Sequence, residues 1–314
     1  MKNRRTFLKM LAAGLAAGGT AVRAGAGQAT APPPAGAGRI RKSVLISMLP
    51  KQLPYAERFA LARTAGFEAI EMQTIAVPEE AAEIRDAAAK TGLRIHSVMN
   101  MDHWRLPLSS ADADVVSRSV KGMETSLRNA ALWGADTVLL VPAVVDATTS
   151  YRQAYERSQR VIRERLLPMA TELKVTIAVE EVWNKFLLSP IEFARYVDEF
   201  DSPRLKAYFD VGNVVIFAFP QDWIRTLGPR IVKVHLKDFN FDRSNGRFTW
   251  KAIGEGDIDW PEVRRALGDI GYAGYVTTEV NGGDGAYLKD VSDRVDRFLA
   301  GQKPVQASGA QILL

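Results

Sequence analysis

Short apolar runs alternate with amphipathic stretches along most of this chain. The runs are rich in β-branched residues and have the length of buried strands, and eight are predicted, over 43–49, 68–72, 94–99, 137–141, 176–181, 205–209, 231–235 and 275–280. Helical patterns separate most of them, over 55–65, 78–91, a long helix ending at Leu132, 151–173, 190–200 and 260–267. Such alternation predicts parallel strands, and eight units predict a single α/β domain, a (β/α)8 TIM barrel.

A doubly wound open sheet is the alternative architecture, but the Gly-x-Gly-x-x-Gly turn typical of it does not follow the first strand. An unusually long segment separates the seventh predicted strand from the eighth. It contains a turn-rich tip over 242–247, and Asp259-x-x-Glu262 resembles a capping box that starts the next helix. The pattern requires no second domain.

Residues 1–28 have the features of an export signal. Arg4 and Arg5 precede an apolar pair and a lysine, and the Ala/Gly/Leu-rich stretch that follows is too short to span a membrane. The segment resembles a Tat signal peptide, which predicts an exported or periplasmic protein, the Tat machinery as a partner and no stable membrane anchor; a basic tail is the alternative. Residues 29–40 are then a Pro/Gly/Ala-rich linker, 41–302 the catalytic barrel and 303–314 a C-terminal tail.

Composition excludes several classes of function. None of the 314 residues is cysteine, so disulfides, thiolate nucleophiles and Cys-ligated zinc are excluded. The net charge of +5 suggests a polyanion partner, but it arises from five basic residues within 1–24, where no acidic residue is present. The remainder is neutral and predicts no nucleic-acid partner.

Ionisable residues lie where four consecutive predicted strands end. Glu180 and Glu181 end the fifth strand and Asp210 the sixth, while His235 ends the seventh and Glu279 lies near the end of the eighth. Barrel enzymes build their sites at this rim. Three carboxylates and one imidazole form a ligand set for Mn²⁺, Mg²⁺, Co²⁺ or Zn²⁺. Only one of the two adjacent glutamates can point inward, and the alternation leaves open which.

Several motifs resemble the sugar isomerase/epimerase family of xylose isomerase-like TIM barrels, in order over 44–299. They are Glu181-Val-Trp-Asn-Lys-Phe186, Tyr208-Phe-Asp-Val-Gly-Asn213, Val234-His-Leu-Lys-Asp238, Gly254-Glu-Gly-x-x-Asp-Trp260 and Gly271-Tyr-x-Gly-Tyr275. Some are most similar to L-ribulose-5-phosphate 3-epimerase and others to ketose 3-epimerases. The resemblance implies one divalent metal, with Mn²⁺ expected first, and excludes Glu180 from the site. It implies as metal ligands Glu181, Asp210, His235 and Glu279, with Glu181 and Glu279 as catalytic acid and base.

This resemblance implies a metal-dependent sugar isomerase or epimerase that removes a proton next to a carbonyl and passes through an enediolate. Two departures affect the substrate: Leu187 stands where ketose 3-epimerases usually have a glutamate, and Asn213 where they often have a histidine. These departures argue against simple epimerisation of a free ketose. Export argues against a sugar phosphate and favours an unphosphorylated or oxidised sugar, such as a keto-glycoside.

Other polar and aromatic residues are weaker candidates for substrate contact. They are Glu71, His96, Trp183 and Lys237, and His103 and Trp104 could line the mouth of the site. Each has a structural alternative, such as a hydrogen-bonded core histidine for His96 or core packing for Trp183.

Three other functions compete with the isomerase. The same proton removal could expel a glycosidic oxygen, which would make a lyase of 3-keto-glycosides by β-elimination. A non-catalytic exported sugar-binding barrel would bind ligand without exchanging carbon-bound hydrogen. An endonuclease of the related fold needs many histidine ligands, and this chain has three histidines in all. Barrels of this family often pair, so a homo-oligomer is an open expectation.

Overall fold

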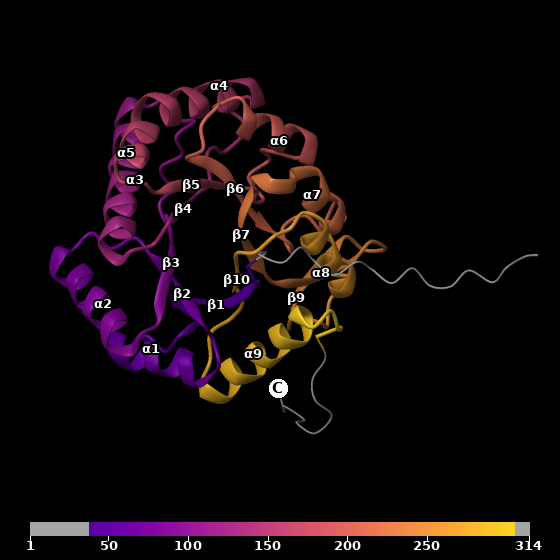
Figure 1. The fold of residues 1–314 in the computed structure, drawn as a ribbon. Coiled ribbons are helices and arrows are strands. Elements are labelled where there is room, and N and C mark those ends of the chain that lie inside the picture. The colour runs from indigo at the N-terminus through magenta and orange to yellow at the C-terminus, as the bar shows by residue number, and fades with distance from the viewer. Residues whose placement is uncertain (1–37, 305–314) are drawn as a thin grey trace, which may run out of the picture. The chain divides into compact units, whose positions relative to one another are not determined.

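Eight parallel strands close into a barrel in the computed structural model, which describes residues 38–304. The last barrel strand pairs with the first and closes the ring (Figure 1). This confirms the predicted (β/α)8 fold. The barrel strands are β1 (Arg41–Leu45), β2 (Ala69–Gln73), β3 (Arg94–Met99), β4 (Thr137–Leu140), β5 (Thr176–Glu180), β6 (Leu205–Asp210), β7 (Ile231–Leu236) and β10 (Tyr275–Thr278).

Helices form a ring outside the strands (Figure 1). Asp259 accepts a hydrogen bond from the backbone N–H of Glu262, which confirms the predicted helix start. No helix within residues 38–304 is both long and apolar enough to cross a membrane. The α-helices are α1 (Tyr55–Thr64), α2 (Pro78–Thr91), α3 (Ala113–Trp133), α4 (Tyr151–Val161), α5 (Leu167–Glu172), α6 (Pro190–Asp198), α7 (Pro220–Leu227), α8 (Trp260–Asp269) and α9 (Gly285–Leu299).

Most predicted elements differ from the structure by one or two residues at an end, and two differ more. The first strand ends at Leu45, and a 3₁₀ turn, η1 (Ile46–Met48), follows it. The helix predicted over 151–173 is divided into α4, a π-helical turn η2 (Ile162–Leu166) and α5. Pro168 lies in the first turn of α5, where its missing N–H cannot continue the α-helical ladder, and the wider π turn precedes it.

The long segment after β7 contains a hairpin where the sequence indicated only a turn-rich tip. Its strands β8 (Asp238–Asp242) and β9 (Arg247–Lys251) pair antiparallel in a two-stranded sheet of their own. Every residue of β9 is exposed, and only Phe248 and Trp250 provide the alternation typical of a strand.

One buried carboxylate holds the base of this hairpin. Asp238 Oδ2 accepts hydrogen bonds from the backbone N–H groups of Gly254 and Gly256, at 2.7 and 3.0 Å, and from the Trp260 indole at 2.9 Å. Its Oδ1 accepts from the Phe239 N–H at 2.8 Å. The Gly254-Glu-Gly256 motif thus places backbone donors around Asp238, and the hairpin leaves and rejoins the barrel at this point.

Strand register determines which side chains share the barrel interior. Asp210 on β6 is the register partner of His235 on β7, and His235 is the partner of Thr277 on β10. Glu180 on β5 is the partner of Tyr208 on β6. Register partners in a parallel sheet point to the same face, so these positions form a polar inner surface near the carboxyl ends of the strands.

Several predictions concern segments outside the described residues. The Tat signal over 1–28, most of the linker over 29–40 and most of the tail over 303–314 belong to this group. They stay predictions.

Candidate metal centre and substrate cavity

Four side chains with metal-binding atoms converge at the carboxyl end of the barrel. They come from the ends of β5, β6 and β7 and from the residue after β10, and one ligand atom of each lies within 4.8 Å of the others: Glu180, Asp210, His235 and Glu279. His235 Nδ1 lies 2.9 Å from the nearest Glu180 oxygen, 3.3 Å from that of Glu279 and 3.7 Å from that of Asp210. The convergence of Asp210, His235 and Glu279 follows the prediction.

The fourth member of the group is Glu180, whereas the sequence comparison had implied Glu181. The register partner of Glu180, Tyr208, has its ring 4.4 Å from that of His235 inside the barrel, so Glu180 also faces inward. Glu181 lies one residue beyond β5, and its Oε1 accepts a hydrogen bond from the Asp210 N–H at 2.8 Å. The structure therefore brings Glu180 into the cluster, where the resemblance had excluded it, because strand register fixes its direction. Glu181 Oε2 is also buried and accepts no hydrogen bond from residues 38–304, and the ligand role of Glu181 stays a prediction.

Glu71 on β2 contacts the ring nitrogen of His235 that does not face the cluster. Its Oε2 lies 2.8 Å from His235 Nε2 and accepts a hydrogen bond from the Tyr208 hydroxyl at 2.8 Å. When Nε2 carries the proton that Glu71 accepts, the lone pair of Nδ1 faces the three carboxylates, as in metal-binding histidines. Glu71 is fully buried and does not line the cavity described below, so this structure gives it the part of a positioning residue, and its contact with substrate stays a prediction.

We expect the Glu71→Gln variant to bind Mn²⁺ about 10- to 100-fold more weakly while it keeps its fold. Glutamine has nearly the same size but lacks the charge that holds the proton on His235 Nε2. Titration of free Mn²⁺ by electron paramagnetic resonance measures the affinity directly. Unchanged affinity would show that Glu71 does not set the orientation of His235.

Hydrogen bonds within the Asp210-Val-Gly-Asn213 motif hold the loop after β6 in place. Asp210 Oδ1 accepts hydrogen bonds from the N–H groups of Gly212 and Asn213, at 2.8 and 2.9 Å, which leaves Oδ2 for the cluster. A Cβ atom at Gly212 would lie 2.5 Å from Lys237 Cγ, so this position requires glycine. The Asn213 amide donates to the Glu181 carbonyl at 2.8 Å and joins this loop to the end of β5.

The cluster concentrates negative charge in a buried place. Burial raises the pKa of Glu180, and repulsion by Glu279 and Asp210 adds to the effect. Burial also raises the pKa of Asp210. Burial alone would lower the pKa of His235, but the carboxylates of Glu71 and Glu279 raise it well above its usual value. These directions all indicate a site that favours bound positive charge.

Lys237 supplies one positive charge beside the cluster. Its ammonium lies 2.9 Å from Asp210 Oδ2 and 2.8 Å from Glu279 Oε2. Although burial opposes the effect, this ammonium and His235 lower the pKa of Glu279 to about 2. Lys237 also lines the cavity described below, which is compatible with substrate contact. That role stays a prediction.

The donor set fits a divalent cation. Asp210 Oδ2 is buried and accepts no hydrogen bond from residues 38–304 in suitable geometry, although the Lys237 ammonium lies near it. Carboxylate oxygens with one imidazole nitrogen suit Mn²⁺, Mg²⁺, Co²⁺ or Zn²⁺. Glu180, Asp210, His235 and Glu279 would hold such an ion.

A cavity of about 290 Å³ gives access to this cluster. Trp183 forms part of its wall: the indole donates to the Asn213 carbonyl at 2.9 Å and stacks on Trp250 of β9 with ring centroids 5.3 Å apart. The predicted mouth residues His103 and Trp104 also line it. The full lining is Met99, Met101, His103, Trp104, Glu180, Val182, Trp183, Asn213, Lys237, Trp250 and Glu279.

His96 takes no part in this cavity. It is fully buried, its Nε2 lies 3.0 Å from Thr277 Oγ1, and its ring stacks on Tyr275 with centroids 4.5 Å apart. Burial lowers its pKa well below the usual value. Its geometry matches the structural alternative, a histidine hydrogen-bonded in the core, and its contact with substrate stays a prediction.

Two residues of the site were missed by the sequence analysis. Tyr208 lies two residues before Asp210 on the same strand, so the period of two would have placed both on the inner face. Trp250 alternates with Phe248 in an exposed strand, and this aromatic pair was the available signal.

Comparisons with known proteins agree with this fold. The chain matches the profile of the xylose isomerase-like TIM barrel family over residues 59–298. L-ribulose-5-phosphate 3-epimerase UlaE from Escherichia coli O1:K1 / APEC is 28% identical over 255 residues, which cover 75% of this chain and 86% of that protein.

Two solved structures have the same fold. A D-tagatose 3-epimerase-like protein has a TM-score of 0.70 at 19% identity, covering 83% of this chain and 97% of that one. The 3-keto-D-glucoside 4-epimerase YcjR from E. coli has a TM-score of 0.67 at 15% identity, covering 81% and 97%. The family match covers more than half of this chain, and these proteins are named as sugar epimerases, which are isomerases. The chain therefore belongs to the xylose isomerase-like TIM barrel family.

Proposed function

We propose that this protein is a divalent metal-dependent isomerase or epimerase of a keto sugar or sugar derivative. The observation that carries the proposal is the lining of the 290 Å³ cavity, which includes two of the four clustered ligands, Glu180 and Glu279. A sugar in this cavity would meet both carboxylates at once. The relative named L-ribulose-5-phosphate 3-epimerase supports a sugar as the substrate.

The two glutamates would perform the proton transfers. A bound divalent ion supplies positive charge that stabilises an enediolate formed next to the breaking C–H bond. Glu180 at the end of β5 and Glu279 after β10 approach the cavity from different strands, so one can remove a proton and the other return it. Return to the opposite face of the same carbon gives epimerisation, and transfer between neighbouring carbons gives isomerisation.

The Glu279→Gln variant is expected to exchange carbon-bound hydrogen about 10³-fold more slowly than the wild type, because an amide cannot accept the proton. Proton NMR of the Mn²⁺-loaded protein in D₂O, with D-fructose, D-allulose and a 3-keto-glucoside, measures the exchange. The matched control is Glu83→Gln, at an exposed position of α2, which should exchange at the wild-type rate.

The products of the same experiment separate the alternatives. A new ketose stereoisomer or an aldose supports the proposed epimerase or isomerase. Release of the aglycone from the 3-keto-glucoside, without change in the free ketoses, would make the protein a lyase. Binding of these sugars without exchange would make it a sugar-binding barrel.

We also propose that residues 1–28 direct export through the Tat machinery, with residues 29–40 as a linker to the barrel. The paired Arg4 and Arg5 support this proposal. The Arg4→Lys/Arg5→Lys variant is expected to stay uncleaved in the cytoplasm, whereas the Lys2→Arg control is exported. Cell fractionation and the mass of the mature chain measure both outcomes, and export of the double variant would contradict the proposal.

A further inference from the structure

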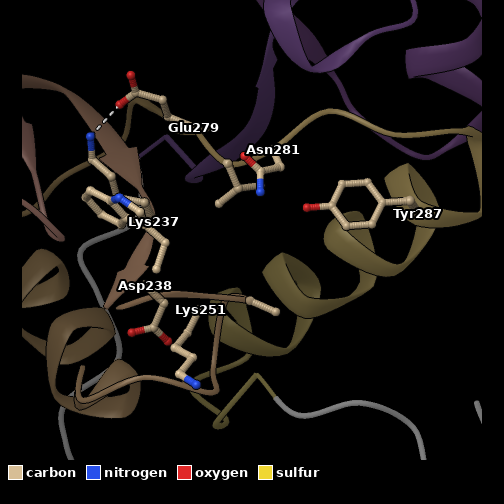
Figure 2. Close-up of a pocket in the computed structure, with 9 residues that line it drawn as sticks. Lys237, Asp238, Lys251, Glu279, Asn281 and Tyr287 are labelled. Atoms are coloured by element: carbon tan, nitrogen blue, oxygen red, sulfur yellow. Dashed lines mark hydrogen bonds and ion pairs between the residues drawn. The ribbon is translucent and has the colours of Figure 1, made fainter. Parts of the chain in front are cut away.

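A second cavity shares part of its wall with the first, and the function proposed above assigns it no ligand. It has a volume of about 340 Å³ and shares three wall residues with the first cavity, Lys237, Trp250 and Glu279. Because Glu279 lines both cavities, a group attached to a ligand held at Glu279 would lie next to the second cavity. Figure 2 shows the Tyr287 hydroxyl pointing toward Asn281 across this space, with Lys251 on the opposite side.

We propose that this second cavity binds a second, uncharged ring joined to the reacting keto sugar, such as the other unit of a disaccharide or a glycoside. The inference rests on the proposed function and specifies its substrate class. Each cavity is near the lower end of the size range of small-ligand sites, so each suits one ring.

The wall chemistry fits an uncharged sugar ring. The Trp250 indole and the Tyr287 phenol offer flat apolar surfaces, while Asn281 and the Tyr287 hydroxyl offer hydrogen-bonding groups. Trp250 is held in place by its stacking on Trp183, with an interplanar angle of 15°. The wall is therefore formed before the ligand arrives.

The charges of the lining argue against a phosphate in this place. Lys237 and Lys251 are balanced by Asp238 and Glu279, and Lys237 is already paired with two carboxylates. A phosphate dianion would therefore meet as many negative as positive side chains.

The nearby helix start gives a phosphate no better site. Many barrels bind phosphate at a helix N-terminus near their last strands. The N-terminus of α9 is instead capped by a carboxylate, since Asp284 accepts a hydrogen bond from the Tyr287 N–H at 2.9 Å. This carboxylate occupies the position that favours an anion.

The test compares probes built on one ketose, D-fructose, with a different group attached at O6 or O4. They are D-fructose, D-fructose 6-phosphate and isomaltulose, in which a glucosyl ring is joined to O6; lactulose, with a galactosyl ring on O4, covers the other attachment. We expect the Mn²⁺-loaded protein to exchange carbon-bound hydrogen of isomaltulose or lactulose with a kcat/KM at least tenfold above that of fructose. Fructose 6-phosphate should gain nothing. A preference for the phosphate over both disaccharides would overturn the inference.

Ala252→Phe is the variant that tests the location, since Ala252 lines only the second of these two cavities. The added ring should remove the preference for the disaccharide. The matched control, Ala131→Phe on the exposed side of α3, should keep it. Should Ala252→Phe not fold, Tyr287→Phe removes a single hydroxyl and should raise the KM for the disaccharide more than that for fructose. An unchanged preference in both variants would overturn the inference.

Failure of the proposed function gives a different result. It would appear as no hydrogen exchange with any probe. In that case saturation-transfer NMR still compares binding of isomaltulose and fructose to the wild type and to Ala252→Phe. Tighter isomaltulose binding that Ala252→Phe abolishes supports the second site, and equal binding overturns it.

Discussion

The Glu180→Gln variant is expected to lose tight Mn²⁺ binding and to exchange carbon-bound hydrogen about 10³-fold more slowly than the wild type. The loss of metal affinity should exceed the roughly 100-fold caused by losing a supporting residue, because an amide cannot replace an anionic ligand. Glu181→Gln, one residue further on, should keep both properties within about fivefold. Its amide oxygen can still accept the hydrogen bond of the Asp210 N–H, at a cost near 1 kcal/mol.

Two measurements decide whether Glu180 or Glu181 is the metal ligand. Mn²⁺ titration by electron paramagnetic resonance gives the affinity, and proton NMR in D₂O gives the exchange rate. Loss of both in Glu181→Gln, with Glu180→Gln intact, would return the ligand role to Glu181. Thermal melts without metal check the fold. Burial, with repulsion by Glu279 and Asp210, disfavours the charged form of Glu180, so neutral glutamine there should leave the metal-free protein at least as stable.

The Asp238→Ala variant is expected to lower the free energy of unfolding by about 3 kcal/mol. Its carboxylate accepts four hydrogen bonds at the base of the hairpin, and alanine would leave those donors without an acceptor. For a domain of this size the loss corresponds to a fall in Tm of roughly 6–12 °C. Calorimetry of the metal-free protein measures it without the contribution of metal binding.

The matched control for Asp238→Ala is Asp242→Ala, at the other end of β8. The Asp242 carboxylate is exposed and bonds within its own turn, to the N–H of Ser244, so its removal should change stability by about 0.5 kcal/mol or less. Equal Tm values for the two variants would show that the bonds to Asp238 do not stabilise the fold.

The barrel and three members of the cluster could be predicted from the sequence. The alternation of strands and helices is a local pattern, and it determines both the fold and the rim at which the strands end. Asp210 and His235 could be placed because each lies at the end of a strand whose neighbours follow in order.

The choice between Glu180 and Glu181 could not be made in the same way. β5 is buried on both faces, since Ile177, Ala178 and Val179 are all inaccessible to solvent. Such a strand has no polar and apolar side, so its pattern shows the period of the alternation but not its phase. Pairing with Tyr208 on β6 supplies that phase, and pairing is a property of the folded chain.

The role of Glu71 and the hairpin were hidden for other reasons. Glu71 and His235 are 164 residues apart, so no local pattern relates them. The two strands of the hairpin pair with each other in a sheet of their own, and in the exposed β9 only Phe248 and Trp250 carry the alternation on which strand prediction relies.

The same hairpin has a consequence for how this barrel could diversify. Its two strands belong to a sheet of their own, and hydrogen bonds to Asp238 hold its base. The length and sequence of the hairpin can therefore change without altering any pairing of the barrel strands. It nevertheless contributes Trp250 to both cavities. Substrate preference can therefore evolve, or be transplanted between related barrels, as an exchangeable module, while the metal ligands stay on a scaffold that the exchange leaves untouched.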